Sequence, residues 1–127
     1  MKLRSHLFIF IIAAISGCSN EPRRAGNVDA SLARESLKTA LESWKKGDPL
    51  AKLKAARPAI VVQDMDWEGG ASLADYQIEG EGKGDTANLR VPVSLTLRDA
   101  KGKEVKKSVT YVVGTSPAIT VFREIFP

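Results

Sequence analysis

The segment from residue 88 to residue 98, NLRVPVSLTLR, alternates without a fault between apolar and polar side chains. In an extended chain successive side chains point to opposite faces, so this alternation predicts a strand with one buried and one exposed face. The DAKGK that follows is typical of a hairpin turn, and Val105, Val109, Tyr111 and Val113 indicate the strand that returns from it. The apolar positions of this hairpin are Leu89, Val91, Val93, Leu95, Leu97, Val105, Val109, Tyr111 and Val113.

A helix ahead of this hairpin is the predicted cover for its apolar face. From Asp29, a predicted N-cap, apolar residues recur at helical spacing as far as Trp44, and Gly47 supplies a left-handed stop. Asp48-Pro49 then predicts the cap and first turn of a second helix that reaches about Arg57. The expected fold class is α+β, with an N-terminal helix and a short second helix packed on a curved antiparallel β-sheet meander.

Shorter strands complete the predicted sheet. Ile60 and Val62 indicate one strand, Tyr76 and Ile78 a second, and residues 118–126 the last. The segments between them, QDMDWEGG and GEGKGD, are predicted to be an acidic loop and a hairpin turn. A phosphate-binding loop would lie between a strand and a helix, so the glycines and lysine of GEGKGD do not indicate one.

Residues 1–17 differ in character from the rest of the chain. A basic start, MKLRSH, precedes the apolar run LFIFIIAAI. Nine residues rise only about 14 Å as a helix, which is too little for a hydrocarbon core of about 30 Å, so this segment is a predicted signal peptide. The last four residues of the pattern, Ile15-Ser16-Gly17-Cys18, resemble the lipobox of bacterial lipoproteins, a resemblance confined to residues 1–18.

The resemblance implies that Cys18 receives a diacylglyceryl group and becomes the acylated N-terminus, which anchors the protein to a membrane. Ser19 in the next position would, in a bacterium with two membranes, place it in the outer membrane, facing the periplasm. Residues 18–27 then form the lipidated cysteine and a flexible tether, and residues 28–127 a single domain. The alternative is an ordinary signal peptide with Cys18 a bystander, although a sole cysteine has no disulfide partner.

The mature chain lacks the residues that most catalytic sites need. Its only histidine, His6, leaves with the signal peptide and its only cysteine carries lipid, so serine triads, Cys-His pairs and the usual zinc sites are excluded. Removal of Lys2 and Arg4 lowers the 19 basic residues to 17 against 15 acidic ones, which does not favour nucleic-acid binding.

A non-catalytic binding or interaction module of the cell envelope, without a cofactor, is therefore the preferred interpretation. Its expected partners are the membrane and an unknown envelope protein or small ligand. The alternative is a small-molecule carrier or a carboxylate-based enzyme. A homodimer through the outer face of the sheet is a further arrangement to consider, although Arg90, Arg98 and the lysines from Lys101 to Lys107 favour a solvated face.

The helix end LESWKKGDP, followed by a short helix and a meander, resembles the nuclear-transport-factor-2-like superfamily, which includes the SnoaL-like proteins. Its members often show an aromatic residue, a small residue and "GD" at this helix end, here Trp44, Gly47 and Asp48. A cystatin-like or other helix-on-sheet fold is the alternative. The resemblance implies a cone between helix and sheet, which is a ligand pocket in some relatives and filled in others.

Four polar residues are candidates for lining such a pocket: Asp75, Tyr76, Tyr111 and Arg123. Arg123 falls in register with the aliphatic residues of the last strand, and an inward arginine needs a partner or a cavity. Asp75 and Glu79 are the expected partners, and Tyr76 and Tyr111 could add hydroxyl groups. The simpler reading is that the strand ends near Phe122 and Arg123 reaches water.

Two further patterns carry weaker chemical signals. Asp64, Asp66, Glu68, Gly69 and Asp75 fall at positions 1, 3, 5, 6 and 12 of a calcium loop, but Asp75 is shorter than the usual glutamate and a strand precedes the loop, so an acidic turn is favoured over a metal site. Ser43-Trp44-Lys45-Lys46 matches S-x-x-K only formally, because it lies at a helix end.

Overall fold

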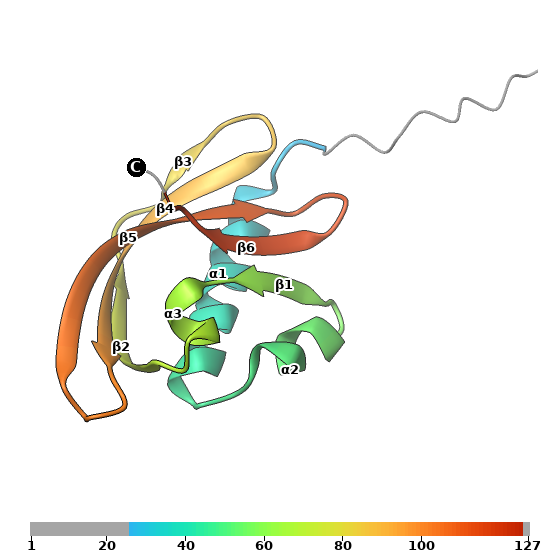
Figure 1. Cartoon of the computed structure of the whole chain (residues 1–127). Helices are drawn as coiled ribbons and strands as arrows, with labels where there is room; N and C mark the ends of the chain where they lie inside the picture. The colour runs from blue at the N-terminus through green and yellow to red at the C-terminus, as the bar shows by residue number, and fades with distance from the viewer. Residues whose placement is uncertain (1–25, 126–127) are drawn as a thin grey trace, which may run out of the picture.

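The structure, a computed structural model, describes residues 26–125 (Figure 1). Within them are the helices α1 (Ala30–Lys45), α2 (Leu50–Ala55) and α3 (Met65–Glu68). The strands are β1 (Ile60–Gln63), β2 (Ser72–Ile78), β3 (Lys83–Gly84), β4 (Asn88–Arg98), β5 (Glu104–Gly114) and β6 (Ile119–Arg123). The predicted signal peptide, Cys18 and all but the end of the predicted tether lie outside the described residues.

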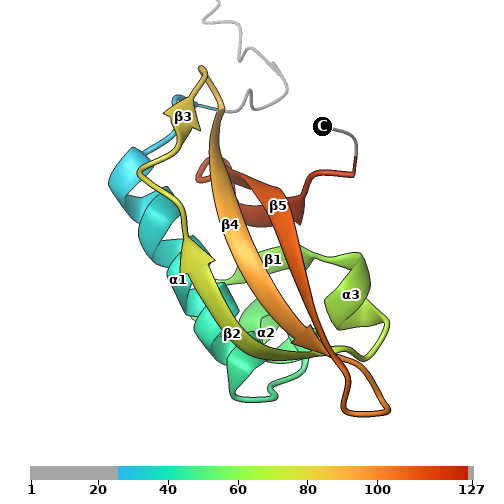
Figure 2. The ribbon, with the colours of Figure 1, turned by 90° about the vertical axis from the view of Figure 1, so that its left-hand side faces the viewer.

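The strands form one sheet that curls into half a barrel (Figures 1 and 2). The order is β1-β6-β5-β4-β2, with β3 paired to β4 beside this path. The predicted antiparallel meander is confirmed for β2, β4, β5 and β6. The expectation of a wholly antiparallel sheet is wrong at one edge, because β1 runs parallel to β6 with Ile60 opposite Ile119.

Helix α1 covers the concave face of the sheet, as the apolar stripe along it predicts (Figure 2). The alternating residues of β4 and β5 point their apolar side chains toward it, so Tyr111 on β5 and Leu37 on α1 are both almost fully buried. Among the described residues, no buried side-chain nitrogen or oxygen lacks a hydrogen-bond partner. The space between helix and sheet is therefore packed by side chains whose polar atoms are satisfied. The buried apolar core comprises Ala33, Leu37, Ala40, Leu41, Trp44, Leu53, Ile60, Trp67, Leu73, Leu89, Val91, Val93, Leu95, Leu97, Tyr111, Val113, Ile119 and Val121.

The ends of α1 follow their sequence signals. The Asp29 carboxylate accepts a hydrogen bond from the Leu32 amide at 3.0 Å, and Gly47 takes a φ of 84° beyond the last turn. The start of α2 differs from the prediction, since its N-cap is Pro49 and no side chain caps it. Asp48 instead turns back and accepts a hydrogen bond from the Ser43 hydroxyl at 2.8 Å.

The chain enters the domain slightly earlier than predicted. Gly26, within the predicted tether, donates an amide hydrogen bond to the Ser116 hydroxyl at 3.4 Å. The amide of Asp29 donates to the Thr115 hydroxyl at 2.9 Å, so the start of α1 is fastened to the β5–β6 turn.

Of the helices in residues 26–125, none has the length and apolar character needed to cross a bilayer.

Helix α3 is the element that the sequence did not predict. It is a single turn within the segment expected to be an acidic loop, and it lies over the open side of the curled sheet (Figures 1 and 2). Asp64 caps it by accepting hydrogen bonds from the amides of Asp66 and Trp67 at 2.9 and 3.2 Å. Its position is fixed by two sets of side-chain contacts, which form the candidate site.

Candidate functional site

A buried cluster of charged and hydroxyl groups lies where α3 meets the concave face of the sheet. The register pairs Tyr111 of β5 with Arg123 of β6, both on the inner face. Asp64 follows the end of β1, the strand beside β6, so it enters the same face next to Arg123. The side chains of Asp64 and Arg123 are only 1% and 8% exposed. Three neighbouring strands thus bring an acid, a phenol and a guanidinium together.

Every buried polar side-chain atom of this cluster has a hydrogen-bond partner. The Tyr111 hydroxyl donates to Asp64 at 2.5 Å, and Arg123 Nη1 donates to the other Asp64 oxygen at 3.2 Å. Arg123 also forms an ion pair with Asp66, which accepts a second hydrogen bond from Lys107 Nζ at 3.2 Å. Two carboxylates face two cations, so the cluster is electrically balanced.

This environment shifts the pKa values of Tyr111 and Asp66. Burial raises the pKa of the Tyr111 hydroxyl far above its ordinary value, and the charge of Asp64 raises it further. Burial also tends to raise the pKa of Asp66, but the hydrogen bonds from Arg123 and Lys107 outweigh it and hold the pKa below the ordinary value. Tyr111 therefore stays a neutral donor while Asp66 stays ionised, which suits a structural network rather than proton transfer.

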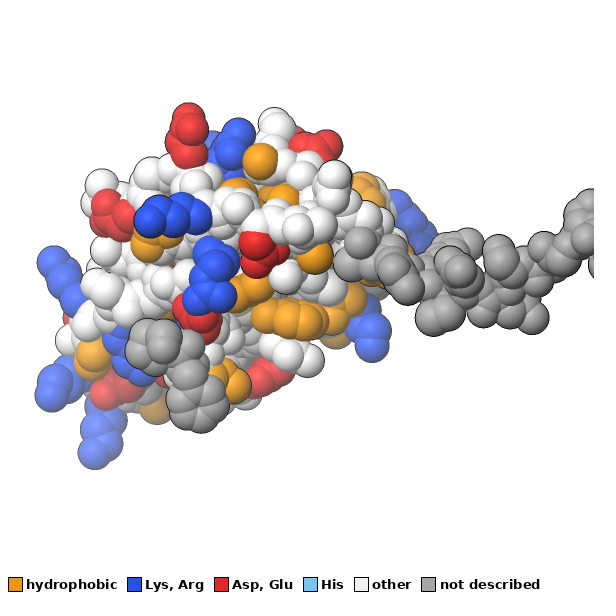
Figure 3. Space-filling model, turned by 90° about the horizontal axis from the view of Figure 1, so that it is seen from above, with side chains coloured by type: hydrophobic (Ala, Val, Ile, Leu, Met, Phe, Trp, Pro, Cys, Tyr) orange, Lys and Arg blue, Asp and Glu red, His pale blue; other side chains and the backbone are white. Residues whose placement is uncertain are grey.

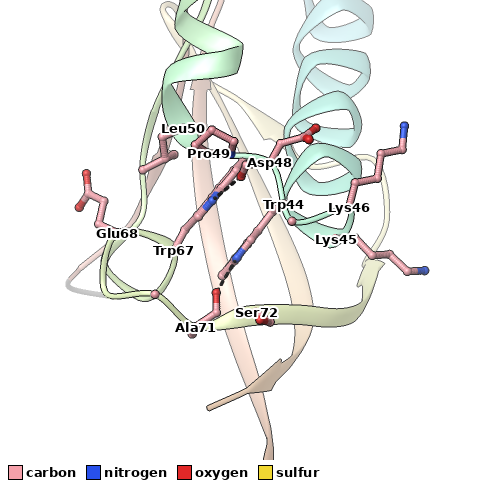
Figure 4. A pocket seen from close by; sticks show the side chains of 12 residues that line it. Trp44, Lys45, Lys46, Asp48, Pro49, Leu50, Trp67, Glu68, Ala71 and Ser72 are labelled. Carbon is pink, nitrogen blue, oxygen red and sulfur yellow. Dashed lines mark hydrogen bonds between the residues drawn. The ribbon is translucent and has the colours of Figure 1, made fainter. Parts of the chain in front are cut away.

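A pair of tryptophans fixes the other side of α3. Trp67 on α3 stacks on Trp44 of α1 with ring centroids 5.3 Å apart and an interplanar angle of 3°. The Trp44 indole donates to the Ala71 carbonyl at 2.8 Å, and the Trp67 indole donates to the Asp48 carbonyl at 3.1 Å. Figure 4 shows both hydrogen bonds and the two parallel rings.

Beside the tryptophans the surface is hollowed into a depression of about 480 Å³. Its floor includes both indoles with Pro49 and Leu50, and its rim carries Lys45, Lys46 and Glu68 (Figure 4). Trp44 and Trp67 are only 2% and 9% exposed, so only a small part of either residue is offered to a ligand. An apolar floor with charges of both signs at the rim suits a small amphipathic molecule or a protruding side chain.

Of the four predicted pocket residues, the structure brings two together. Tyr111 and Arg123 meet in the buried cluster, whereas Asp75 and Tyr76 lie on β2 at the opposite edge of the sheet. Tyr76 donates to Glu42 of α1 at 2.5 Å, and the exposed Asp75 pairs with Lys45 at 3.4 Å. Tyr76 and Asp75 therefore hold α1 against β2.

The expectation that an inward Arg123 would need a partner is confirmed, whereas the alternative, in which the strand ends near Phe122 and Arg123 reaches water, is wrong. The strand continues through Arg123, and the side chain turns inward instead of reaching water. Its partners are Asp64 and Asp66, not Asp75 or Glu79, because β1 rather than β2 is the neighbour of β6. Glu79 accepts a hydrogen bond from the Ser94 hydroxyl on the outer face.

The residues of the weak calcium pattern do not converge. Asp64 and Asp66 are held by cations in the cluster, Glu68 lies at the exposed end of α3, and Asp75 lies in β2. Within residues 26–125 no three acidic or metal-ligating side chains gather as a metal ion would need. The Ser43 hydroxyl, of the S-x-x-K pattern, donates to Asp48. GEGKGD connects the antiparallel strands β2 and β4 as predicted, but Lys83–Gly84 within it form the short strand β3 instead of part of a simple turn.

The sequence reasoning missed the role of Asp64 as the hub of the cluster and the stacking of the two tryptophans. One local signal for α3 was present, because an aspartate followed by Asp66 and Glu68 is typical of an N-cap and an acidic first turn. Compared with protein-family models, with curated proteins and with solved structures, the chain has no significant match.

Proposed function

We infer that the chain is a membrane-anchored lipoprotein of the cell envelope whose domain is a non-catalytic binding module. The observation that carries the second part is the buried cluster. Its inner acid–base groups, Asp64, Tyr111 and Arg123, are enclosed and bonded through Asp64. Its outer groups, Asp66 and Lys107, are paired within the cluster, so no group of the cluster is left unpartnered to act on a substrate. The lipobox pattern that ends at Cys18 carries the anchor.

The binding site in this proposal is the depression beside Trp44 and Trp67, because it combines an apolar floor with a charged rim at the surface. The stacked indoles and their backbone hydrogen bonds fix the floor before any ligand arrives, which lowers the entropic cost of binding. The carrier or carboxylate-enzyme alternative would use an internal cone with Asp75, Tyr76, Tyr111 and Arg123. Those residues lie in two separate places, which weighs against it.

We also propose that the domain belongs to the nuclear-transport-factor-2-like superfamily. The support is the layout of an amphipathic helix ending in Trp44, Gly47 and Asp48, a short second helix, and a curled sheet that wraps around the first helix. In such a relative the cone would be of the filled kind, since the core side chains and the buried cluster occupy it.

The anchor is tested by producing the full chain in its own host and measuring its intact mass and its distribution between membrane and soluble fractions. The wild-type chain should carry the mass of attached acyl groups and stay with the membranes, whereas Cys18→Ser should lose both. Ser19→Ala is the neighbouring control and should keep the acyl mass. Membrane retention of Cys18→Ser at full yield would overturn the lipid anchor.

The binding site is tested by native mass spectrometry of the protein purified from its host. A retained ligand of a few hundred daltons should be lost in Lys46→Ala/Glu68→Ala, which changes the rim of the depression, but not in Lys54→Ala/Glu81→Ala, which changes exposed charges elsewhere. A ligand that survives both variants would lie elsewhere and would favour the carrier alternative.

A further inference from the structure

The end of the β4–β5 hairpin, residues 98–107, is unusually basic. We name it the basic finger. It contains five basic residues and two acidic ones, and it projects beyond the helices at the lower left of Figure 1. Like charges that lie close together on two strands repel one another and lower stability unless opposite charges pair with them. The ion pairs within the finger therefore determine how many of its positive charges are free to bind a partner.

The two acidic residues are engaged within the finger itself. The Asp99 carboxylate accepts hydrogen bonds from the amides of Lys101 and Lys103, each at 2.9 Å, and thereby shapes the turn. Glu104 pairs with Arg98 across the strands at 2.9 Å.

The remaining cations divide into one that is paired and three that are not. Lys107 reaches Asp66 of the buried cluster. The exposed side chains of Lys101, Lys103 and Lys106 form no ion pair with any residue between 26 and 125. The finger therefore presents a run of free ammonium groups.

One turn at the opposite end of the molecule has the reverse charge balance. The turn between β2 and β4 carries Glu79, Glu81 and Asp85 against Lys83 alone. It lies at the end where the chain enters the domain, since the Val28 amide donates to the Thr86 carbonyl at 3.0 Å. Figures 1 and 2 both place this turn and the finger at opposite ends. Figure 3, seen onto the entry end, shows acidic and basic side chains interspersed there and a group of basic side chains projecting at the left margin, the side of the finger.

The finger and the entry of the chain lie at opposite ends of the domain, which determines where the finger lies relative to a membrane. If the chain is anchored through Cys18, as proposed above, the finger lies at the end of the domain away from the anchor. Only this direction rests on the proposed lipid anchor; the charge of the finger does not.

We propose that the basic finger binds a polymer with repeated phosphate groups. The free cations are all lysines, which act on phosphate oxygens as point charges, and the Arg98 guanidinium, which could give a phosphate or a carboxylate a two-pronged contact, is already bound to Glu104. Behind the finger, the outer face of the sheet is hollowed into a trough of about 390 Å³ whose polar lining includes Lys106, Thr96, Ser108 and Gln77. Asp75 also lines the trough, at its β2 side, where its carboxylate is paired with Lys45. Hydroxyl and amide groups there can donate to phosphate oxygens that pass over the strands.

The test uses the full chain, extracted from its host in a neutral detergent, with long-chain inorganic polyphosphate as the probe. Lys101→Ala/Lys103→Ala should bind at least tenfold more weakly at low salt. It should also lower the slope of log K against log salt by roughly 0.7 for each lysine, as for contacts to single-stranded nucleic acid. The matched control is Lys54→Ala/Lys83→Ala, which removes the same charge from exposed positions outside the finger and should bind like the wild type.

Three outcomes would overturn the proposal. Equal loss in both double variants would mean that net charge alone, and not the finger, sets the affinity. Binding of poly-L-glutamate as tight as that of polyphosphate would remove the preference for phosphate. Binding to phosphatidylglycerol vesicles with no binding to polyphosphate would make the finger a membrane contact. The same measurement on Cys18→Ser protein from the soluble fraction tests the finger without the lipid anchor. If this protein still binds polyphosphate through the finger, the proposal stands even where the lipid anchor is wrong.

Discussion

Asp64 receives hydrogen bonds from two backbone amides, a phenol and a guanidinium, so it is the residue whose loss should disturb the most contacts. Asp64→Asn keeps the size and part of the capping capacity but removes one of the two carboxylates that compensate the buried Arg123, leaving Asp66 alone. Breaking a buried ion pair from one side costs at most about 3–5 kcal/mol of unfolding free energy, and the remaining pair with Asp66 places this loss at the lower end of that range. Urea unfolding followed by far-ultraviolet circular dichroism measures it.

The control for this substitution is Asp75→Asn, which breaks the exposed pair with Lys45 at 3.4 Å. Exposed pairs contribute about 0–1 kcal/mol, so the midpoint of this variant should barely move. Equal, small losses in the two variants would show that the buried cluster does not hold α3 in place.

The chain's two tyrosines should both resist ionisation in the folded state. Burial raises the pKa of Tyr76 to about 12, with the hydrogen bond to Glu42 and the charges of Glu42 and Asp75 adding to the effect. Because the folded pKa lies above that of an unfolded tyrosine, near 10, the associated stability is complete below about pH 10 and is lost as the pH rises through 12. Alkaline titration of the phenolate absorbance measures this.

Tyr76→Phe separates the two tyrosines in that titration. In this variant only Tyr111 remains, and its phenolate should form only as the protein unfolds, since burial and Asp64 raise its pKa still further. Half-ionised tyrosine at pH 10 with native circular dichroism would contradict the assignment of Tyr111 if seen in Tyr76→Phe, and that of Tyr76 if seen in the wild type alone.

At the scale of the element, α3 depends on tertiary contacts because a single helical turn is too short to be stable alone. Trp67→Ala removes the ring that stacks on Trp44 and should cost about 3–5 kcal/mol of unfolding free energy. Met65→Ala on the same turn is the matched control, because Met65 is 50% exposed and should cost less than about 0.5 kcal/mol. Chemical denaturation monitored by tryptophan fluorescence distinguishes them, and a cost of Trp67→Ala no greater than that of Met65→Ala would argue against docking of α3 through the stack.

The elements that could be predicted are those whose signal is local. The helical stripe of α1 ends at Trp44, and the alternation of β4 predicts its burial pattern residue by residue. The pairing of β1 with β6 could not be predicted, because the two strands are separated by the whole meander and neither has a pattern that names its neighbour. The error about Arg123 follows directly, since the strand beside β6 decides which acid lies within its reach.

At the scale of the whole molecule, the stability of the fold depends on pH because two of its carboxylates have a lowered pKa in the folded state. The pKa of Asp66 is held below its ordinary value by Arg123 and Lys107 against the effect of burial. Hydrogen bonds from Ser43 and Lys52 lower the pKa of Asp48, which lies at the turn between α1 and α2. Both carboxylates therefore favour the folded state only while they are ionised.

The sign of the resulting pH dependence is fixed by these directions. Because the folded pKa of each acid is depressed, its contribution is complete above the unfolded value of about 4 and is lost as the pH falls through the folded value. Urea midpoints should thus be nearly constant from pH 7 to 5 and fall steeply below 4. Asp66→Asn should be less stable at pH 7 and show a shallower fall in acid, because the proton uptake that drives part of it has been removed. The control is Asp75→Asn, because Asp75 lies outside the buried cluster, and its urea midpoint should still fall steeply below pH 4. If the midpoint of Asp66→Asn falls as steeply as that of the wild type, other carboxylates govern acid unfolding.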